Sequence, residues 1–170
     1  MKTIVVYESH YGNTAAVARA IAEGIGEGAT ALTTDEATED ALEGVDLVVA
    51  GAPVMALRLP TDAVLSRMEA DPKRAGADMS HRSMRDWLDV IPRGHGHGAA
   101  FETKLRWSPG GATGAIEKGL EAAGYRRVGK SHKFVVTGGE GPLRDGELEA
   151  AGAWGAELRR TVASLVRAGV

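Results

Sequence analysis

Cysteine is absent from this 170-residue chain, and aromatic residues make up only 5% of it. Without cysteine, the chain forms no disulfide, has no thiol redox chemistry, and offers no cysteine ligand to zinc or to an iron–sulfur cluster. Any redox chemistry must therefore come from a bound cofactor. Because aromatic residues are so few, the core must be mainly aliphatic.

The chain also lacks an excess of positive charge and a long hydrophobic run. Its formal net charge is −3, and the absence of a basic patch argues against nucleic acid as a partner. The apolar run Ile4–Tyr7 is too short for a signal peptide or for a membrane span, which needs about 20 residues. We therefore expect a cytoplasmic protein without a membrane span, and the length fits a single domain, 1–170.

Buried strands and amphipathic helices alternate along the chain. Ile4–Tyr7 and Asp46–Gly51 are continuous apolar runs, typical of strands buried on both faces of a parallel sheet. Between Asn13 and Gly26, apolar residues recur every four positions, which predicts a helix. Such alternation, repeated five times, predicts a three-layer α/β sandwich around a parallel sheet. The other expected strands are 29–33, 99–102 and 126–136, and the other expected helices are 38–42, 62–70, 84–91, 112–123 and 147–167.

Several polar segments are interpreted as surface structure. The segment 72–83 has no periodicity and is expected to be a mobile surface loop. His95 and His97 lie in the run Gly-His-Gly-His-Gly. Two histidines at this spacing make a weak metal site, so a solvated loop is the favoured interpretation. Glu8 ends the first strand and is expected to face solvent.

The loop Ser9–Thr14 lies between the first buried strand and the first helix. A loop in this position presents free backbone N–H groups and the positive end of a helix dipole, which together attract phosphate. Gly12 allows close approach of the backbone, and Ser9, Asn13 and Thr14 add short polar side chains. Neither lysine nor arginine occurs between residues 3 and 18, which argues against a P-loop nucleotidase. An ordinary helix N-cap is the alternative interpretation.

Several segments of the chain resemble flavodoxin-like proteins. Residues 5–14 (VVYESHYGNT) are similar to that family's loop for the phosphate of flavin mononucleotide (FMN), Ser/Thr-x-Thr/Ser/Tyr-Gly-x-Thr. Tyr11 in the third place resembles the quinone-reductase and actinobacterial branches. Residues 46–53 are similar to the family's third strand and the start of its second FMN loop, and residues 137–148 to the segment before its last helix. The resemblance implies a flavodoxin-like five-stranded parallel sheet in the order 2-1-3-4-5, with ligand at the carboxyl ends of strands 1 and 3.

By this resemblance, FMN places its phosphate in Ser9–Thr14 and its ring between loops 52–61 and 102–111. The second loop departs from the family pattern because it has no aromatic residue; Met55 and Leu57 would cover a ring face instead. Trp107 is expected either to stack on the flavin or to pack on a neighbouring helix. The candidate cofactor-binding residues are Ser9, His10, Tyr11, Gly12, Asn13, Thr14, Ala52, Pro53, Val54, Met55, Ala56, Leu57, Glu102, Thr103, Lys104 and Trp107.

Three hypotheses for function remain. The first is an FMN-binding redox protein that carries electrons through its flavin, with a redox protein or a small planar acceptor such as a quinone as partner. The second is an FMN-dependent NAD(P)H:quinone-type oxidoreductase. The third is a flavodoxin-fold binding module that has lost the flavin. Arg58, Lys104 and Arg106 on the expected rim argue against an acidic, low-potential shuttle.

Overall fold

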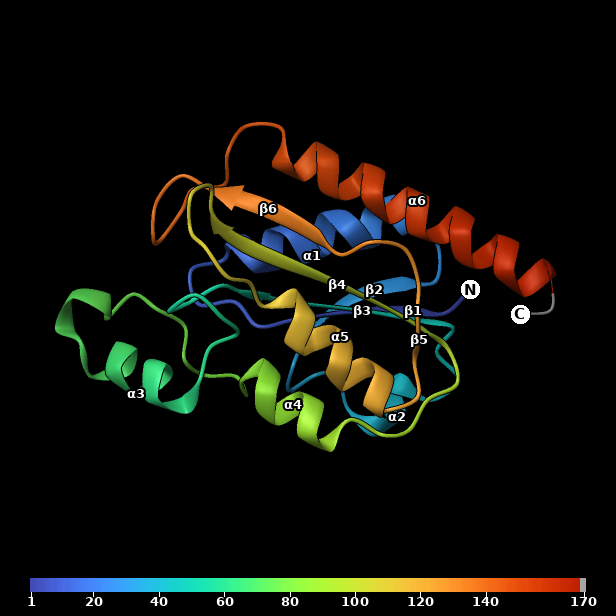
Figure 1. Ribbon diagram of the computed structural model, residues 1–170, viewed down its shortest axis with the longest axis horizontal. Helices are drawn as coiled ribbons and strands as arrows, with labels where there is room; N and C mark the ends of the chain where they lie inside the picture. Colours follow the sequence, from blue (N-terminus) through green and yellow to red (C-terminus); the bar gives the residue numbers. More distant parts are fainter. Residues whose placement is uncertain (169–170) are drawn as a thin grey trace.

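The computed structural model describes residues 1–168, whose strands form one parallel sheet (Figure 1). The strand order is β2-β1-β3-β4-β5, which confirms the predicted order of the sheet. β5 and β6 both pair in parallel with β4, so the segment 126–136, expected to contain a strand pair or one bent strand, forms two short strands. The strands are β1 (Thr3–Tyr7), β2 (Ala29–Thr33), β3 (Leu47–Pro53), β4 (His97–Leu105), β5 (Arg126–Arg127) and β6 (His132–Val136).

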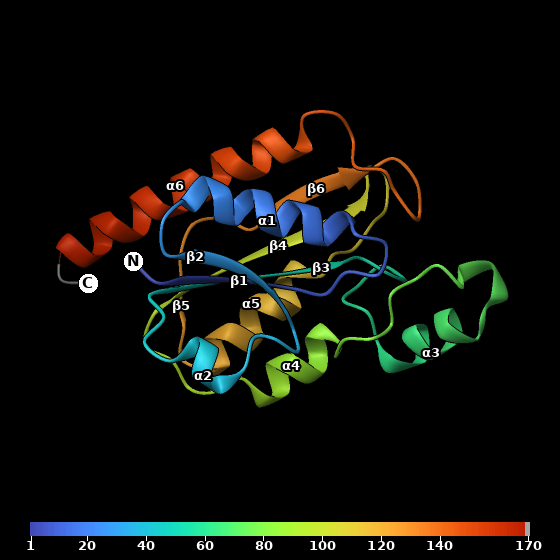
Figure 2. The same ribbon diagram turned by 180° about the vertical axis from the view of Figure 1, so that it is seen from behind.

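Helices cover both faces of this sheet (Figures 1 and 2). α1 and α6 lie on one face, and α2, α4 and α5 lie on the other. In the described part of the chain, no helix is both long and apolar enough to cross a membrane. The helices are α1 (Asn13–Ile25), α2 (Glu39–Leu42), α3 (Asp62–Ala70), the 3-10 helix η1 (Pro72–Arg74), α4 (Met84–Val90), α5 (Thr113–Ala122) and α6 (Glu147–Arg167).

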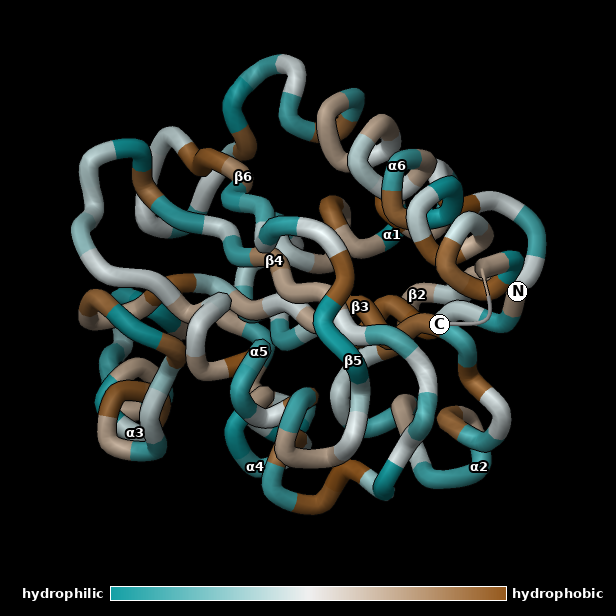
Figure 3. Tube along the Cα trace, turned by 45° about the vertical axis from the view of Figure 1, so that its right-hand side comes forward, coloured by the Kyte–Doolittle hydropathy of each residue, from teal (hydrophilic) through white to brown (hydrophobic). Residues whose placement is uncertain are grey.

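Two apolar layers hold the helices to the sheet. Successive side chains of a strand point to opposite faces. Val5 therefore joins the layer under α1 and α6, whereas Val6 joins the layer under α4 and α5. Aromatic residues stabilise the first layer: the rings of Phe101 and Phe134 meet edge to face with centroids 6.1 Å apart. Figure 3 shows hydrophobic residues gathered around β3, between the helical layers.

Strand β4 is longer than the sequence predicted. It runs from His97 to Leu105 rather than from residue 99 to 102; it pairs with β3 from His97 to Thr103 and with β6 from Phe101 to Leu105. His97 is only 4% exposed, so the expectation of a solvated loop was wrong for this residue. The small and polar residues at the strand ends have low strand propensity, and pairing with β3 and β6 supplies the stability that local propensity lacks.

Candidate functional site

A cleft of about 460 Å³ opens at the carboxyl ends of β1, β3 and β4. Small-molecule sites typically measure about 300–1,000 Å³. All three predicted loops contribute to its walls, together with α3 and η1. The predicted site residues that line the cleft are Ser9, His10, Tyr11, Asn13, Thr14, Pro53, Val54, Met55, Ala56, Thr103 and Lys104.

A larger hollow of about 630 Å³ lies at the opposite edge of the sheet, beside the amino ends of β3 and β4. Doubly wound sheets bind ligands at the carboxyl ends of their strands, so the 460 Å³ cleft is the candidate site. Among residues 1–168, no cluster of three or more His, Asp or Glu residues is arranged to hold a metal ion.

The N-terminus of α1 presents unpaired backbone donors at the cleft. Within residues 1–168, no acceptor is hydrogen-bonded to the backbone N–H groups of residues 10–14. The next N–H, that of Ala15, donates to Ser9 Oγ at 3.2 Å, and the Ala16 N–H donates to the Gly12 carbonyl at 3.0 Å. Gly12 has φ 83°, a left-handed conformation that glycine adopts without a Cβ penalty. Consecutive free donors at a helix N-terminus form an anion-binding nest.

Side chains of this loop tie it to two other loops. Thr14 Oγ1 lies 2.8 Å from Thr103 Oγ1, and Asn13 Nδ2 donates to the Glu140 carbonyl at 3.0 Å. The sequence predicted these side chains as phosphate donors. In the structure they fix the position of the loop, and the backbone offers the free donors. The loop at residues 137–146 thereby joins the site, and Gly139 lines the cleft.

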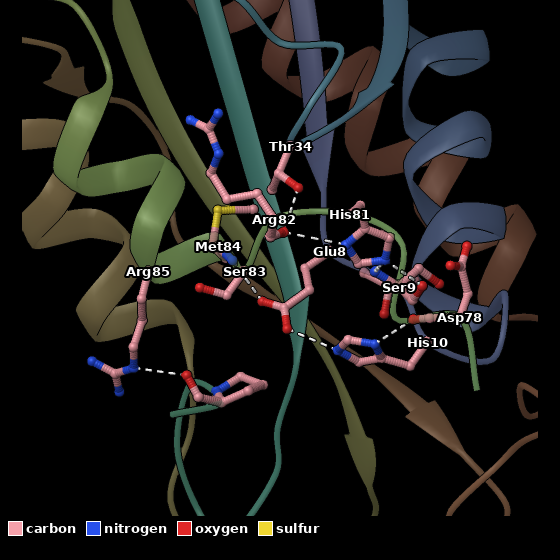
Figure 4. Close-up of polar contacts among 12 residues, drawn as sticks. Glu8, Ser9, His10, Thr34, Asp78, His81, Arg82, Ser83, Met84 and Arg85 are labelled. Atoms are coloured by element: carbon pink, nitrogen blue, oxygen red, sulfur yellow. Dashed lines mark hydrogen bonds and ion pairs between the residues drawn. The ribbon is translucent and has the colours of Figure 1, made fainter. Parts of the chain in front are cut away.

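The segment Asp78–Met84 is fastened to the beginning of the phosphate loop (Figure 4). The Asp78 N–H donates to the His10 carbonyl at 2.7 Å, and the Met84 N–H donates to Glu8 Oε2 at 2.8 Å. His81 Nε2 lies 2.8 Å from the Ser9 carbonyl oxygen. Residues 78–83 form a loop at the surface, as predicted, with Asp78, Ser80 and Arg82 exposed. The segment Asp78–Met84 is nevertheless fastened to Glu8, Ser9 and His10 by hydrogen bonds that no local pattern in the sequence predicts.

Glu8 and His10 form a buried pair beneath the nest. Glu8 is 0% exposed, so the expectation that it faces solvent was wrong; the Asp78–Met84 segment covers it. His10 Nε2 lies 2.8 Å from Glu8 Oε1, and Nδ1 lies 2.8 Å from the Asp78 carbonyl oxygen. Burial lowers the pKa of His10, but its hydrogen bonds to Glu8 and Asp78, with the charges of both, outweigh burial and raise the pKa above 6.5.

The stabilising contribution of His10 should disappear as the pH rises. Its pKa is higher in the folded than in the unfolded chain, so the contribution is complete below the unfolded value of 6.5. It is lost as the pH passes the folded value. We expect the advantage of wild type over His10→Gln in free energy of unfolding to shrink between about pH 6 and pH 9. Urea titrations of both proteins measure it, and an advantage that stays constant over this range would contradict the expectation.

The tip of the second loop is a two-residue hairpin turn. Met55 and Arg58 exchange backbone hydrogen bonds of 2.9 and 3.1 Å. Between them, Ala56 has φ 48° and Leu57 has φ 69°. Left-handed backbone at non-glycine residues costs about 1–2 kcal/mol each. The Leu57 carbonyl accepts the Gly111 N–H at 3.1 Å, which joins the second loop to the third, while the Leu57 side chain is exposed and does not line the cleft.

Replacing this turn by Asn-Gly should stabilise the protein. Asn-Gly is the preferred pair for a turn with two left-handed residues, so Ala56→Asn with Leu57→Gly should raise the free energy of unfolding by about 1–2 kcal/mol. Thermal unfolding measures the change. Ala115→Gly, on the exposed face of α5, is the matched control and should lower stability by about 1 kcal/mol. An unchanged melting temperature in the double variant would show that the turn is not strained.

Glu102 lies under the third loop rather than in the cleft lining. Its Oε2 accepts the N–H groups of Ala112 at 2.7 Å and Thr113 at 3.1 Å, which stabilises the start of α5. Lys104 Nζ lies 3.6 Å from Glu102 Oε1 and donates to the Gly110 carbonyl. The buried carboxylate therefore organises the loop and balances the lysine charge.

Trp107 does not line the cleft. Trp107 is 83% exposed, so the expectation that it packs on a neighbouring helix was wrong. The Arg106 guanidinium lies 4.8 Å from the centre of the indole ring, which is its described aromatic contact. Gly12 and Ala52 also lie outside the cleft lining, although the Gly12 N–H belongs to the nest.

Sequence reasoning missed one wall of the cleft. Val64, Arg67, Met68, Asp71 and Arg74, from α3 and η1, all line it. Arg67 lies in α3 and Arg74 lies in η1, and the extended residue Asp71 separates the two helices. No helical period therefore relates the two arginines, and no local pattern in the sequence indicates this wall.

Comparison with known proteins supports the flavodoxin-like assignment. The sequence profile of the flavodoxin domain family matches residues 4–64, which include β1, the nest and β3. No curated protein sequence matches the chain significantly. The match to the family profile covers the loop Ser9–Thr14 and the second loop, 52–61, and ends within α3, before the third loop.

Solved structures show the same fold over almost the whole chain. A flavodoxin from the domain Archaea superposes with a TM-score of 0.67 at 21% identity, covering 96% of this chain and 99% of that one. Flavodoxin 1 of Bacillus cereus gives 0.64 at 21% identity, covering 94% and 98%. The rubredoxin oxygen:oxidoreductase of Desulfovibrio gigas gives 0.62 at 14% identity, covering 97% of this chain and 37% of that one. The chain therefore has the flavodoxin-like α/β fold.

Proposed function

We propose that this protein binds FMN and transfers electrons through it. The observation that carries the proposal is the run of free backbone N–H groups at residues 10–14, which opens into a cleft at the switch point of the sheet. A terminal phosphate suits this nest, because it offers backbone donors and a helix dipole instead of a lysine or arginine. The flavodoxin profile match over the same residues supports FMN as the ligand whose phosphate binds here.

The residues of the cleft fit the rest of FMN. A mainly apolar part of the cleft lining could pack against a flat ring; it consists of Val54, Met55, Ala56, Thr103 and Leu105. Bound FMN would supply one- or two-electron chemistry, and these residues would orient the ring and shield it from water.

The test is uptake of FMN by the purified protein. Titration with FMN should quench flavin fluorescence, shift the visible absorption bands and saturate at one FMN per chain. Heat denaturation should release FMN unchanged. A protein that takes up no FMN would overturn the proposal and favour a binding module that has lost the flavin.

The oxidoreductase hypothesis has its own supporting observation. α3 and η1 form one wall of the cleft, which favours a small substrate beside the flavin over direct contact with a large partner. NAD(P)H oxidation by the FMN-loaded protein with a quinone as acceptor would separate this enzyme from a carrier. A carrier would exchange electrons with a redox protein and show no turnover with NAD(P)H.

A further inference from the structure

Residues 62–77 leave the three-layer sandwich and form a lobe beside the cleft (Figures 1 and 3). The lobe contains α3 and η1, and Met68 is the buried side chain of these two helices. α4 and α5 already cover this face of the sheet with Met84, Trp87 and Ile116. The lobe therefore adds little to the core, and its position at the carboxyl ends of the strands calls for another role.

The lobe brings two guanidinium groups to the cleft. Arg67 and Arg74 both line it, together with Asp71. Asp71 Oδ2 lies 3.7 Å from Arg74 Nε and accepts the Lys73 N–H through Oδ1, so this carboxylate partly balances Arg74. In the described part of the chain, Arg67 makes no ion pair. On the opposite wall, Glu102 already balances Lys104. The excess positive charge of the cleft side chains thus lies on the lobe.

The nest and the two lobe arginines line the same cleft. The ionised group of oxidised FMN is its phosphate, which the nest accounts for under the proposed function. FMN therefore leaves the lobe arginines without an anion. Val54, Met55, Val64 and Leu105 add apolar side chains to the lining of this cleft. A ligand that completes this site carries one anionic group on a flat, apolar body.

We infer that the lobe forms a subsite for the anionic group of a flat organic redox substrate, a carboxylate or a sulfonate. This inference rests on the proposed FMN function and names the class of substrate. Guanidinium groups suit such anions because their N–H groups form paired, charge-assisted hydrogen bonds with two oxygens. Arg67 contributes most to binding the anionic group, because the carboxylate of Asp71 already partly neutralises the guanidinium of Arg74.

The test uses two redox-inert ligands of matched shape, 2-naphthoate and 2-naphthamide, on the oxidised, FMN-loaded protein. Calorimetry and the flavin difference spectrum report binding without any electron transfer. Naphthoate should bind about fivefold to tenfold more tightly than naphthamide, a modest ratio because the arginines are half exposed. Added salt should reduce this preference. Arg67→Gln should abolish most of it, and the double variant with Arg74→Gln should abolish all of it.

Arg160→Gln, an exposed arginine on α6, is the matched control and should keep the wild-type preference. Equal affinities for the two ligands in wild type would overturn the inference, as would a preference that survives in the double variant. Loss of FMN uptake by wild type would instead contradict the proposed function, and it is measured first. All variants change exposed side chains, and thermal unfolding confirms that they fold.

Discussion

Asn13→Asp should weaken FMN binding by at least about two orders of magnitude while leaving the FMN-free protein folded. The new carboxylate would lie in the first turn of α1, beside the nest, and would repel the phosphate. Two unit charges about 4 Å apart interact by about 4 kcal/mol near a protein surface, equivalent to several hundredfold in affinity. Aspartate in the first turn of a helix is itself favourable by about 0.3–1 kcal/mol, so folding should not suffer.

Asn13→Ala is the control for this substitution. It removes the bond from Asn13 Nδ2 to the Glu140 carbonyl without adding charge, and should weaken FMN binding only severalfold. Fluorescence titration gives both dissociation constants, and urea unfolding of the FMN-free proteins gives both stabilities. Equal effects of the two substitutions on affinity would place the phosphate elsewhere.

Gly155→Ala should destabilise the protein by about 3 kcal/mol, because α1 and α6 pack backbone to backbone. A Cβ atom at Gly155 would lie 2.3 Å from the Ile21 carbonyl oxygen, and a main-chain atom cannot rotate out of the way. The helices must then separate, which loosens the apolar layer that also contains Phe101 and Trp154. We expect a loss in melting temperature of several degrees, measured by circular dichroism.

Gly152→Ala, one turn earlier in α6, is a sharp control. A Cβ atom there would have its nearest contact at 3.6 Å, the Ala20 carbonyl oxygen, which is an ordinary distance. Alanine is about 1 kcal/mol more favourable than glycine in a helix, so this variant should be as stable as wild type or more so. Comparable losses in both variants would mean that helix α6 does not pack this closely on α1.

Much of the fold could be predicted because its signals are local. The continuous apolar runs at β1 and β3 identify strands buried on both faces, and the four-residue period before Gly26 identifies α1. Parallel strands joined by helices then restrict the topology to a few arrangements. The ends of β4 could not be predicted this way, because Gly98 and Lys104 are weak strand formers that pair only because β3 lies beside the first and β6 beside the second.

The candidate site likewise has parts that local sequence predicts and parts that it does not. Ser9–Thr14 is a contiguous loop whose place in the fold follows from the strand before it and the helix after it. Glu8 was misjudged, since the Asp78–Met84 segment that buries it lies about 70 residues away in the chain. Arg67 and Arg74 were missed for a similar reason. Nothing in the local sequence indicates that α3 and η1 lie beside the cleft.

The sequence by itself determined the parallel α/β architecture, the position of the loop Ser9–Thr14 between β1 and α1, and the absence of thiol chemistry, because periodicity and residue type act over a few positions. Only the tertiary structure decided which side chains share the cleft and which carboxylate pairs with which imidazole. It also decided that the backbone N–H groups of residues 10–14 remain free. These features depend on contacts between segments that are distant in the chain, and such contacts produce no periodic pattern in the sequence.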